Sequence, residues 1–137
     1  MVFSFKSQKD NKKLPEHLET GELGEEIACK FLKNKGYKIL NRNFRRKFGE
    51  IDIVSKKDIF YYFIEVKTSL EKEDRELNRP EERVEKHKIK RIGMAVQTYL
   101  LQNKMENSDW KFAVIAILLS PDRKTAKVRM IEDILPE

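Results

Sequence analysis

Two short apolar segments carry residues that could hold a metal ion beside a proton carrier. The first, Gly49-Glu50-Ile51-Asp52-Ile53-Val54, contains Asp52, and the second, Ile64-Glu65-Val66-Lys67, contains Glu65 and Lys67. In a β-strand, side chains two residues apart point to the same face and lie roughly 6–7 Å from each other, so Glu65 and Lys67 share a face. Mg²⁺ takes oxygen ligands and keeps several waters, so two or three carboxylates are enough to bind it. We therefore predict that Asp52 and Glu65 bind Mg²⁺ (or Mn²⁺) and that Lys67 is a third catalytic residue, in a metal-dependent phosphodiesterase and most simply a nuclease.

A hairpin would bring the two segments together. A turn about Lys57-Asp58 pairs position 52 with 63 and position 50 with 65, which makes Asp52 and Glu65 diagonal neighbours. Glu50 then shares their face, and we expect it to support the metal ligands without binding the metal itself. The opposite face holds the apolar residues that anchor the hairpin in the core, which are Ile51, Ile53, Ile64 and Val66. The alternative is that Glu50 and Glu65 form edge-strand ion pairs with Lys67 and nearby arginines.

Glu25 is the best candidate for a further metal ligand. It aligns with Ala28 and Leu32 at helical spacing, so it borders the buried stripe of a helix. The alternative is a first-turn carboxylate that stabilises the positive end of the helix, and spacing alone does not separate the two interpretations. Glu26 aligns with Lys30, which predicts an exposed ion pair within the helix.

Basic residues flank the acidic segments and favour an anionic partner. The formal net charge is +6 and the pI is near 9.3. Contacts of such clusters with phosphates would make binding salt-dependent, which predicts nucleic acid, DNA in particular, as the partner. The alternative is that the clusters are ordinary solvated surfaces. The predicted nucleic-acid-binding residues are Arg42, Arg45, Arg46 and Lys47 before the Asp52 strand, and Lys86, Lys88, Lys90 and Arg91 at the start of a later helix.

Length and composition limit the remaining choices. A chain of 137 residues is expected to form one domain, here over 18–137, preceded by a flexible basic arm over 1–17. The single Cys29 excludes an internal disulfide, and its place in a helical pattern predicts a small core residue. No apolar run approaches the ~18 residues that span a bilayer, and no secretory segment follows the start, so we expect no membrane partner and a cytoplasmic location. A homodimer or a protein partner stays open, and the polar segment 70–85 is where we expect a protein partner to bind.

The rest of the pattern describes the elements that position these residues. Helical spacing covers about 20–35 and about 84–103. Strands are expected at about 37–41, 49–55, 59–67, 111–119 and 124–131. The order α-β-β-β-α-β-β, with a short connection between the second and third strands, predicts an antiparallel meander covered by helices in an α/β fold.

Several multi-residue motifs in one order resemble the YraN family of small bacterial proteins. They are Gly24-Glu25-Glu26-Ile27-Ala28, Gly36-Tyr37, Asn41-Arg42-Asn43, Gly49-Glu50-Ile51-Asp52 and Glu65-Val66-Lys67-Thr68, within a resemblance over roughly residues 20–118. That family is similar to the restriction-endonuclease-like, or PD-(D/E)xK, superfamily. The resemblance implies a central mixed sheet with flanking helices and a metal site made of an Asp followed by Glu-x-Lys.

Carried over by residue, the resemblance implies that Asp52 and Glu65 are metal ligands, that Lys67 lies beside the nucleophilic water, and that Glu25 completes the site. The family usually has Arg where this chain has Ser69 and Asp where it has Ala113. The implied function is a Mg²⁺-dependent nuclease that cleaves structured or single-stranded DNA in repair or recombination. The alternative is a nucleic-acid-binding module without turnover of its own, which acts with a partner.

Overall fold

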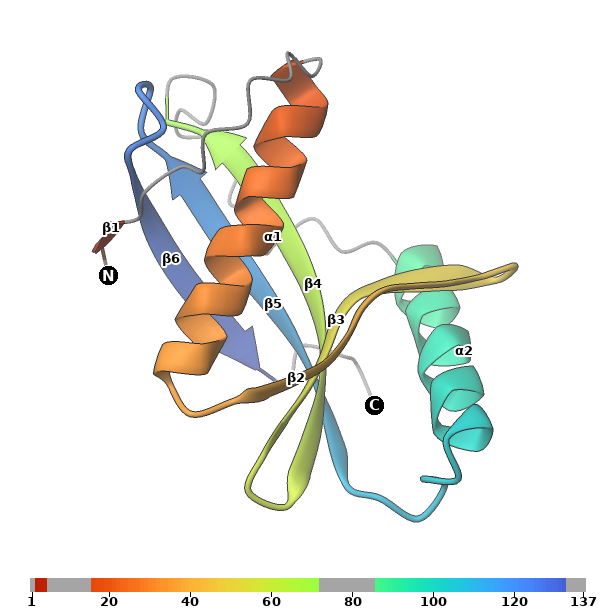
Figure 1. The fold of residues 1–137 in the computed structure, drawn as a ribbon. Helices are drawn as coiled ribbons and strands as arrows, with labels where there is room; N and C mark the ends of the chain where they lie inside the picture. The colour runs from red at the N-terminus through yellow and green to blue at the C-terminus, as the bar shows by residue number, and fades with distance from the viewer. Residues whose placement is uncertain (1, 5–15, 72–85, 133–137) are drawn as a thin grey trace.

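The computed structural model describes residues 2–4, 16–71 and 86–132, which form one mixed sheet with a helix on each face (Figure 1). The strand order is β1-β6-β5-β4-β3-β2. The elements are β1 (Val2–Ser4), α1 (Glu16–Asn34), β2 (Lys38–Arg46), β3 (Gly49–Lys57), β4 (Phe60–Leu70), α2 (Lys86–Gln102), β5 (Trp110–Leu119) and β6 (Thr125–Glu132).

The predicted α/β class and the order α-β-β-β-α-β-β are confirmed. Strands β2, β3 and β4 form an antiparallel meander, and β4 pairs in parallel with β5 across the connection that contains α2. Strand β6 returns antiparallel to β5. This arrangement is consistent with the restriction-endonuclease-like fold that the resemblance implies. The sequence pattern did not predict β1, which pairs with β6 at the far edge of the sheet.

Two cores cover the two faces of the sheet. Alternation along β4 sends Tyr62 and Ile64 to α1, and Tyr61 and Phe63 to α2. Helix α1 buries the predicted apolar stripe together with Cys29, which confirms that this cysteine is a core residue. Strand β5 is buried on both faces over most of its length, as expected for a strand inside a sheet with helices on both sides.

The register of the β3–β4 hairpin differs from the prediction. Lys57 pairs with Phe60, and residue 54 rather than 52 lies opposite Phe63. The turn therefore contains Asp58, which adopts a positive φ of 56°, a conformation that aspartate tolerates better than most residues. The error is an even number of positions, so it does not change the face of the paired residues: Ile53 and Ile64 share one face, and Val54 and Phe63 share the other.

Two further predictions about the meander were wrong. Strand β2 continues to Arg46, so Arg42, Arg45 and Arg46 lie within the strand and not after it; β3 pairs with β2 along this length, past a bulge between Ile39 and Asn41. Ile51 packs against α2 and not with Ile53, because it pairs with Phe44 where the β2–β3 hairpin curves over towards α2 (Figure 1).

The ends of several predicted segments also moved or lie outside the described residues. Of the arm expected over 1–17, the structure describes Val2–Ser4 as part of the sheet and the start of α1 at Glu16. Of the segment 70–85, it describes only Leu70, which ends β4, and Glu71. Within the described ranges, neither helix combines the length and the apolar character that a bilayer span requires.

Candidate functional site

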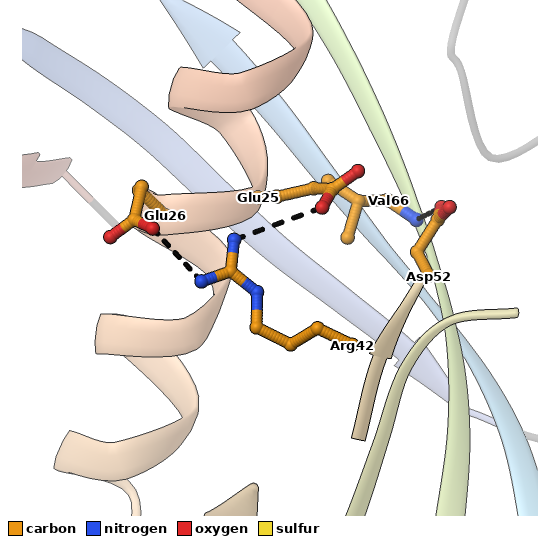
Figure 2. Close-up of polar contacts among 5 residues, drawn as sticks. All are labelled: Glu25, Glu26, Arg42, Asp52 and Val66. Carbon is orange, nitrogen blue, oxygen red and sulfur yellow. Dashed lines mark hydrogen bonds and ion pairs between the residues drawn. The ribbon is translucent and has the colours of Figure 1, made fainter. Parts of the chain in front are cut away.

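The candidate site lies where β3 separates from β4. The last paired residues are Ile53 and Ile64, and beyond them β4 continues to Leu70 beside β5 alone. Asp52 is the first residue past the last pair. Its Oδ2 accepts a hydrogen bond of 2.7 Å from the Val66 N–H, which the departing strand no longer satisfies (Figure 2). The split in the sheet therefore fixes a carboxylate at the edge of β4.

Asp52 is held in a negative environment. The pKa of its carboxyl is raised to about 6, chiefly by burial; the hydrogen bond from Val66 lowers it in part, and the charges of Glu25, Glu65 and Glu50 add to the rise. Acidic residues from α1, β3 and β4 thus act on one carboxylate. A cation at this point would offset the repulsion that now favours the protonated form.

Glu65 and Lys67 occupy the same face of β4, as their spacing predicts. The Lys67 Nζ lies 3.6 Å from the Glu65 Oε2, and the two side chains are 25% and 14% exposed. The ion pair that was the alternative interpretation therefore exists. Both groups are mostly buried, and the charge of Glu65 also acts on Asp52, so the pair places an ammonium next to one of the acids that raise the pKa of Asp52.

Glu50 follows the alternative interpretation more closely. Its carboxylate lies 3.4 Å from the Arg45 Nε on β2, with both side chains mostly exposed. An exposed pair of this kind stabilises a fold by little. Glu50 reaches the site only through its charge, which contributes to the raised pKa of Asp52.

Arg42 joins β2 to α1 through two glutamates. Its guanidinium donates a hydrogen bond of 2.9 Å to Glu26 and lies 3.8 Å from Glu25 (Figure 2). The bond to Glu26 raises the pKa of Arg42 above its ordinary value. Glu26 thus pairs with a neighbouring strand, which the helical spacing did not indicate, and Arg42 is already engaged by carboxylates in place of phosphate.

The donor chemistry suits a hard cation, but the ligands are not assembled. All three predicted ligands are carboxylates, and Glu25 is only 22% exposed beside the split. Among the residues that the structure describes, no three Asp, Glu, His or Cys side chains are grouped as a metal site. Closing the predicted set of Asp52, Glu65 and Glu25 requires side-chain rotation, and Glu25 must turn away from Arg42.

The structure brings the two predicted basic clusters together. The Arg91 Nε of α2 donates a 3.0 Å hydrogen bond to the Phe48 carbonyl in the β2–β3 turn. Gly49 permits this approach, because a Cβ there would lie 2.8 Å from the Arg91 carbonyl oxygen. We call the exposed residues Arg45, Arg46, Lys47, Lys90 and Arg91 the basic hairpin surface. Lys86 and Lys88 lie in the first turn of α2, and their side chains are outside the described part.

Gly24 is a site-supporting residue that the sequence reasoning missed. A Cβ at this position would collide with the Thr68 Oγ1 and lie 2.9 Å from the Thr68 Cβ, so α1 approaches β4 closely beside Glu25. A glycine inside a helix costs about 1 kcal/mol of stability relative to alanine. A glycine within the predicted helix was therefore the sign in the sequence that another element packs closely at this position.

We expect Gly24→Ala to destabilise the protein by about 1–3 kcal/mol, because the added methyl pushes α1 off β4. Gly21→Ala is the matched control in the same helix. A Cβ at Gly21 has no neighbour within 4 Å, so that variant should gain about 0.5–1 kcal/mol. Urea unfolding of both variants measures the difference. Equal stabilisation by the two substitutions would contradict the close packing at Thr68.

Comparisons with known proteins agree with the resemblance found in the sequence. The model of a family described as "Uncharacterised protein family UPF0102" matches residues 24–117. A UPF0102 protein of Campylobacter jejuni is 45% identical over 97 residues, which cover 71% of this chain and 81% of the relative. One of Thermotoga maritima is 46% identical over 82 residues, 60% of this chain and 71% of the relative. One of Pelobacter propionicus is 44% identical over 107 residues, 77% of this chain and 74% of the relative. The matched region contains Glu25, Asp52, Glu65 and Lys67 and both strands that separate at the split, β3 and β4. The chain belongs to the UPF0102, or YraN, family.

Proposed function

We propose that the protein is a Mg²⁺- or Mn²⁺-dependent nuclease that cleaves phosphodiester bonds of structured or single-stranded DNA in repair or recombination. The observation that carries the proposal is the environment of Asp52. Its carboxylate is fixed at the split between β3 and β4, its pKa is raised to about 6, and the charges of Glu25 and Glu65 contribute to that shift. A mostly buried acid whose pKa is perturbed by desolvation and by neighbouring charges is typical of functional sites.

Each residue has a distinct role in the proposed site. Asp52, Glu65 and Glu25 would hold the cation, and the Val66 N–H keeps the Asp52 carboxylate oriented towards the split. A bound divalent cation would supply a water of lowered pKa and offset the charge that develops on the phosphate. Lys67 holds the attacking water and a phosphate oxygen through its ammonium, which is 3.6 Å from Glu65.

The basic hairpin surface supports DNA as the substrate. Its residues lie on the hairpin whose β3 strand also carries Asp52 and on the helix that contacts its turn. Contacts of this surface with phosphates would position the DNA backbone next to the acids, without recognising the base sequence. Arg42 is not part of this surface, because its guanidinium is bound to Glu26.

A second candidate is a nucleic-acid-binding module that lacks turnover alone and acts with a partner. The observation that favours it is the unassembled ligand set, with Arg42 close to Glu25. In this case DNA binding would survive the removal of Glu65, and a partner would be needed to close the site.

Calorimetric titration of Mn²⁺ separates the two candidates. We expect binding by the wild type and a loss of more than about a hundredfold in affinity for Asp52→Asn and for Glu65→Gln, since even residues behind the ligands typically matter by 10- to 100-fold. Glu106→Gln, at an exposed acid in the loop before β5, is the control and should bind like the wild type. The titration is repeated with a short phosphorothioate DNA, which supplies phosphate oxygens while resisting cleavage.

Cleavage assays on branched, single-stranded and duplex DNA complete the test. Metal-dependent cleavage that is lost in both site variants supports the nuclease. No Mn²⁺ binding with or without DNA, together with DNA binding that Glu65→Gln leaves unchanged, overturns the nuclease in favour of the binding module.

A further inference from the structure

Phe48 is exposed at the tip of the β2–β3 hairpin. Its side chain is 45% exposed, and among the described residues it is the one aromatic side chain in the group of exposed large apolar residues, which also contains Ile59, Met94 and Leu101. The other aromatic side chains of the meander pack inside, Phe44 against Tyr99 and Phe63 against Tyr99 and Trp110. A single exposed apolar side chain is common on protein surfaces, so the meaning of Phe48 depends on what surrounds it.

The surroundings of Phe48 are cationic. Residues 42–50 contain four cationic side chains and one anionic side chain, and Lys47 adjoins Phe48 in the turn. Arg91 of α2 is exposed and bonded to the Phe48 carbonyl, and its neighbour in the helix, Lys90, is also exposed. Charge of this sign disfavours a purely apolar protein partner and favours a ligand that combines phosphates with flat rings.

The hairpin tip is held in place. The Arg91 hydrogen bond fixes the Phe48 carbonyl, and the Gly49 backbone lies directly against the Arg91 carbonyl. In addition, the Arg46 guanidinium stacks 4.1 Å from the Phe44 ring centroid and donates to the Gln102 side chain. The backbone that carries the Phe48 ring is therefore held in place, so less conformational entropy is lost when a ligand stacks on the ring.

We propose that Phe48 is a base-stacking residue that selects nucleic acid with an unpaired base. The inference rests on the proposed function for its ligand class and adds the feature of the substrate that the protein recognises. An exposed ring flanked by cations stacks on an unpaired base while the cations bind the adjacent phosphates. Phe48 precedes Asp52 by four residues of extended strand, about 13 Å, which is close to four stacked nucleotides of one strand.

Anisotropy titration of fluorescein-labelled oligonucleotides in EDTA tests the inference without cleavage. The probes are a single strand containing 2-aminopurine and a matched duplex. We expect Phe48→Ala to weaken single-strand binding by about fivefold to a hundredfold, the range typical of base–aromatic stacking, and to leave duplex binding within about twofold. Quenching of 2-aminopurine should be lost with it, and Phe48→Tyr should restore both signals. Ile59→Ala is the matched control, because Ile59 is exposed at the turn of the β3–β4 hairpin.

The outcomes distinguish this inference from the proposed nuclease. Unchanged single-strand binding and quenching in Phe48→Ala overturn the stacking role, even if the wild type binds Mn²⁺ and cleaves DNA. Equal losses for single strand and duplex also overturn it, because they indicate a general effect on the basic hairpin surface. Stacking that depends on Phe48 in a protein that neither binds Mn²⁺ nor cleaves supports the inference and overturns the nuclease alone. Absence of any binding at low salt, where phosphate contacts are strongest, overturns the inference together with its ligand class.

Discussion

Asp52→Asn is expected to stabilise the metal-free protein at pH 8 and to have little effect at pH 4. Burial and the neighbouring acids raise the pKa of Asp52 from 3.8 to about 6, so the folded protein favours the protonated carboxyl. The stability that this group contributes is fully present below the unfolded pKa and is lost as the pH rises through the folded pKa, between about 4 and about 6. Above that window the ionised carboxylate destabilises the fold by up to about 3 kcal/mol.

Asparagine removes this charge and keeps the shape of the side chain. Its side-chain oxygen can still accept the hydrogen bond from the Val66 N–H, so the contact that joins β3 to β4 at the split is retained. At pH 8 in a chelator, we expect the variant to unfold about 3–10 °C above the wild type. Asp109→Asn, at an exposed aspartate before β5, is the control and should change the midpoint little.

Metal reverses the order of stability. Mn²⁺ that binds the folded wild type raises its unfolding midpoint with concentration, while Asp52→Asn should not respond. Thermal unfolding of the wild type and the variant is measured under four conditions, at pH 4 and pH 8, each in chelator and in Mn²⁺. A variant that is less stable than the wild type at both pH values would show that Asp52 is mainly a structural acceptor for Val66, and the argument for a strained metal ligand would fail.

The sequence was sufficient for the order of the elements from α1 to β6 and for the shared face of Glu65 and Lys67 on β4. Glu65 and Lys67 are two apart in one strand, so their shared face follows from strand geometry alone. Periodicity also placed Glu25 beside the buried stripe of α1, but spacing alone left open whether it is a metal ligand or a carboxylate at the positive end of the helix. The face that a residue occupies depends only on periodicity within one element.

Predictions that depended on how two elements meet were less successful. The hairpin register was wrong because it depends on which residue takes the positive φ in the turn, here Asp58. The contact of Arg42 with Glu26 was not foreseen, because it depends on how closely α1 packs against β2. Ile51 was assigned to the wrong core because hairpin curvature, which moves the tip towards α2, is not encoded by alternation.

Lys67→Met is expected to lower the rate of DNA cleavage by about 10²- to 10³-fold, the usual cost of removing one charge-stabilising donor from an active site. Methionine retains most of the apolar stem of lysine and removes the ammonium, which lies 3.6 Å from Glu65. If the ammonium holds the water and the phosphate, the rate falls while Mn²⁺ affinity stays within a few-fold of the wild type. Lys67→Arg restores the charge with a different shape, so an intermediate rate is expected.

The alternative for Lys67 is an ion pair that only neutralises Glu65. That role predicts another pattern: loss of the ammonium leaves Glu65 mostly buried without its nearby cation, so unfolding free energy falls and Mn²⁺ binding changes along with it. Single-turnover cleavage, Mn²⁺ calorimetry and urea unfolding on the same preparations separate the two roles. Lys127→Met, at an exposed lysine on β6, controls for the loss of one positive charge. A rate that stays at the wild-type level in Lys67→Met would exclude Lys67 from the chemistry, and the site would then have to act through its carboxylates alone.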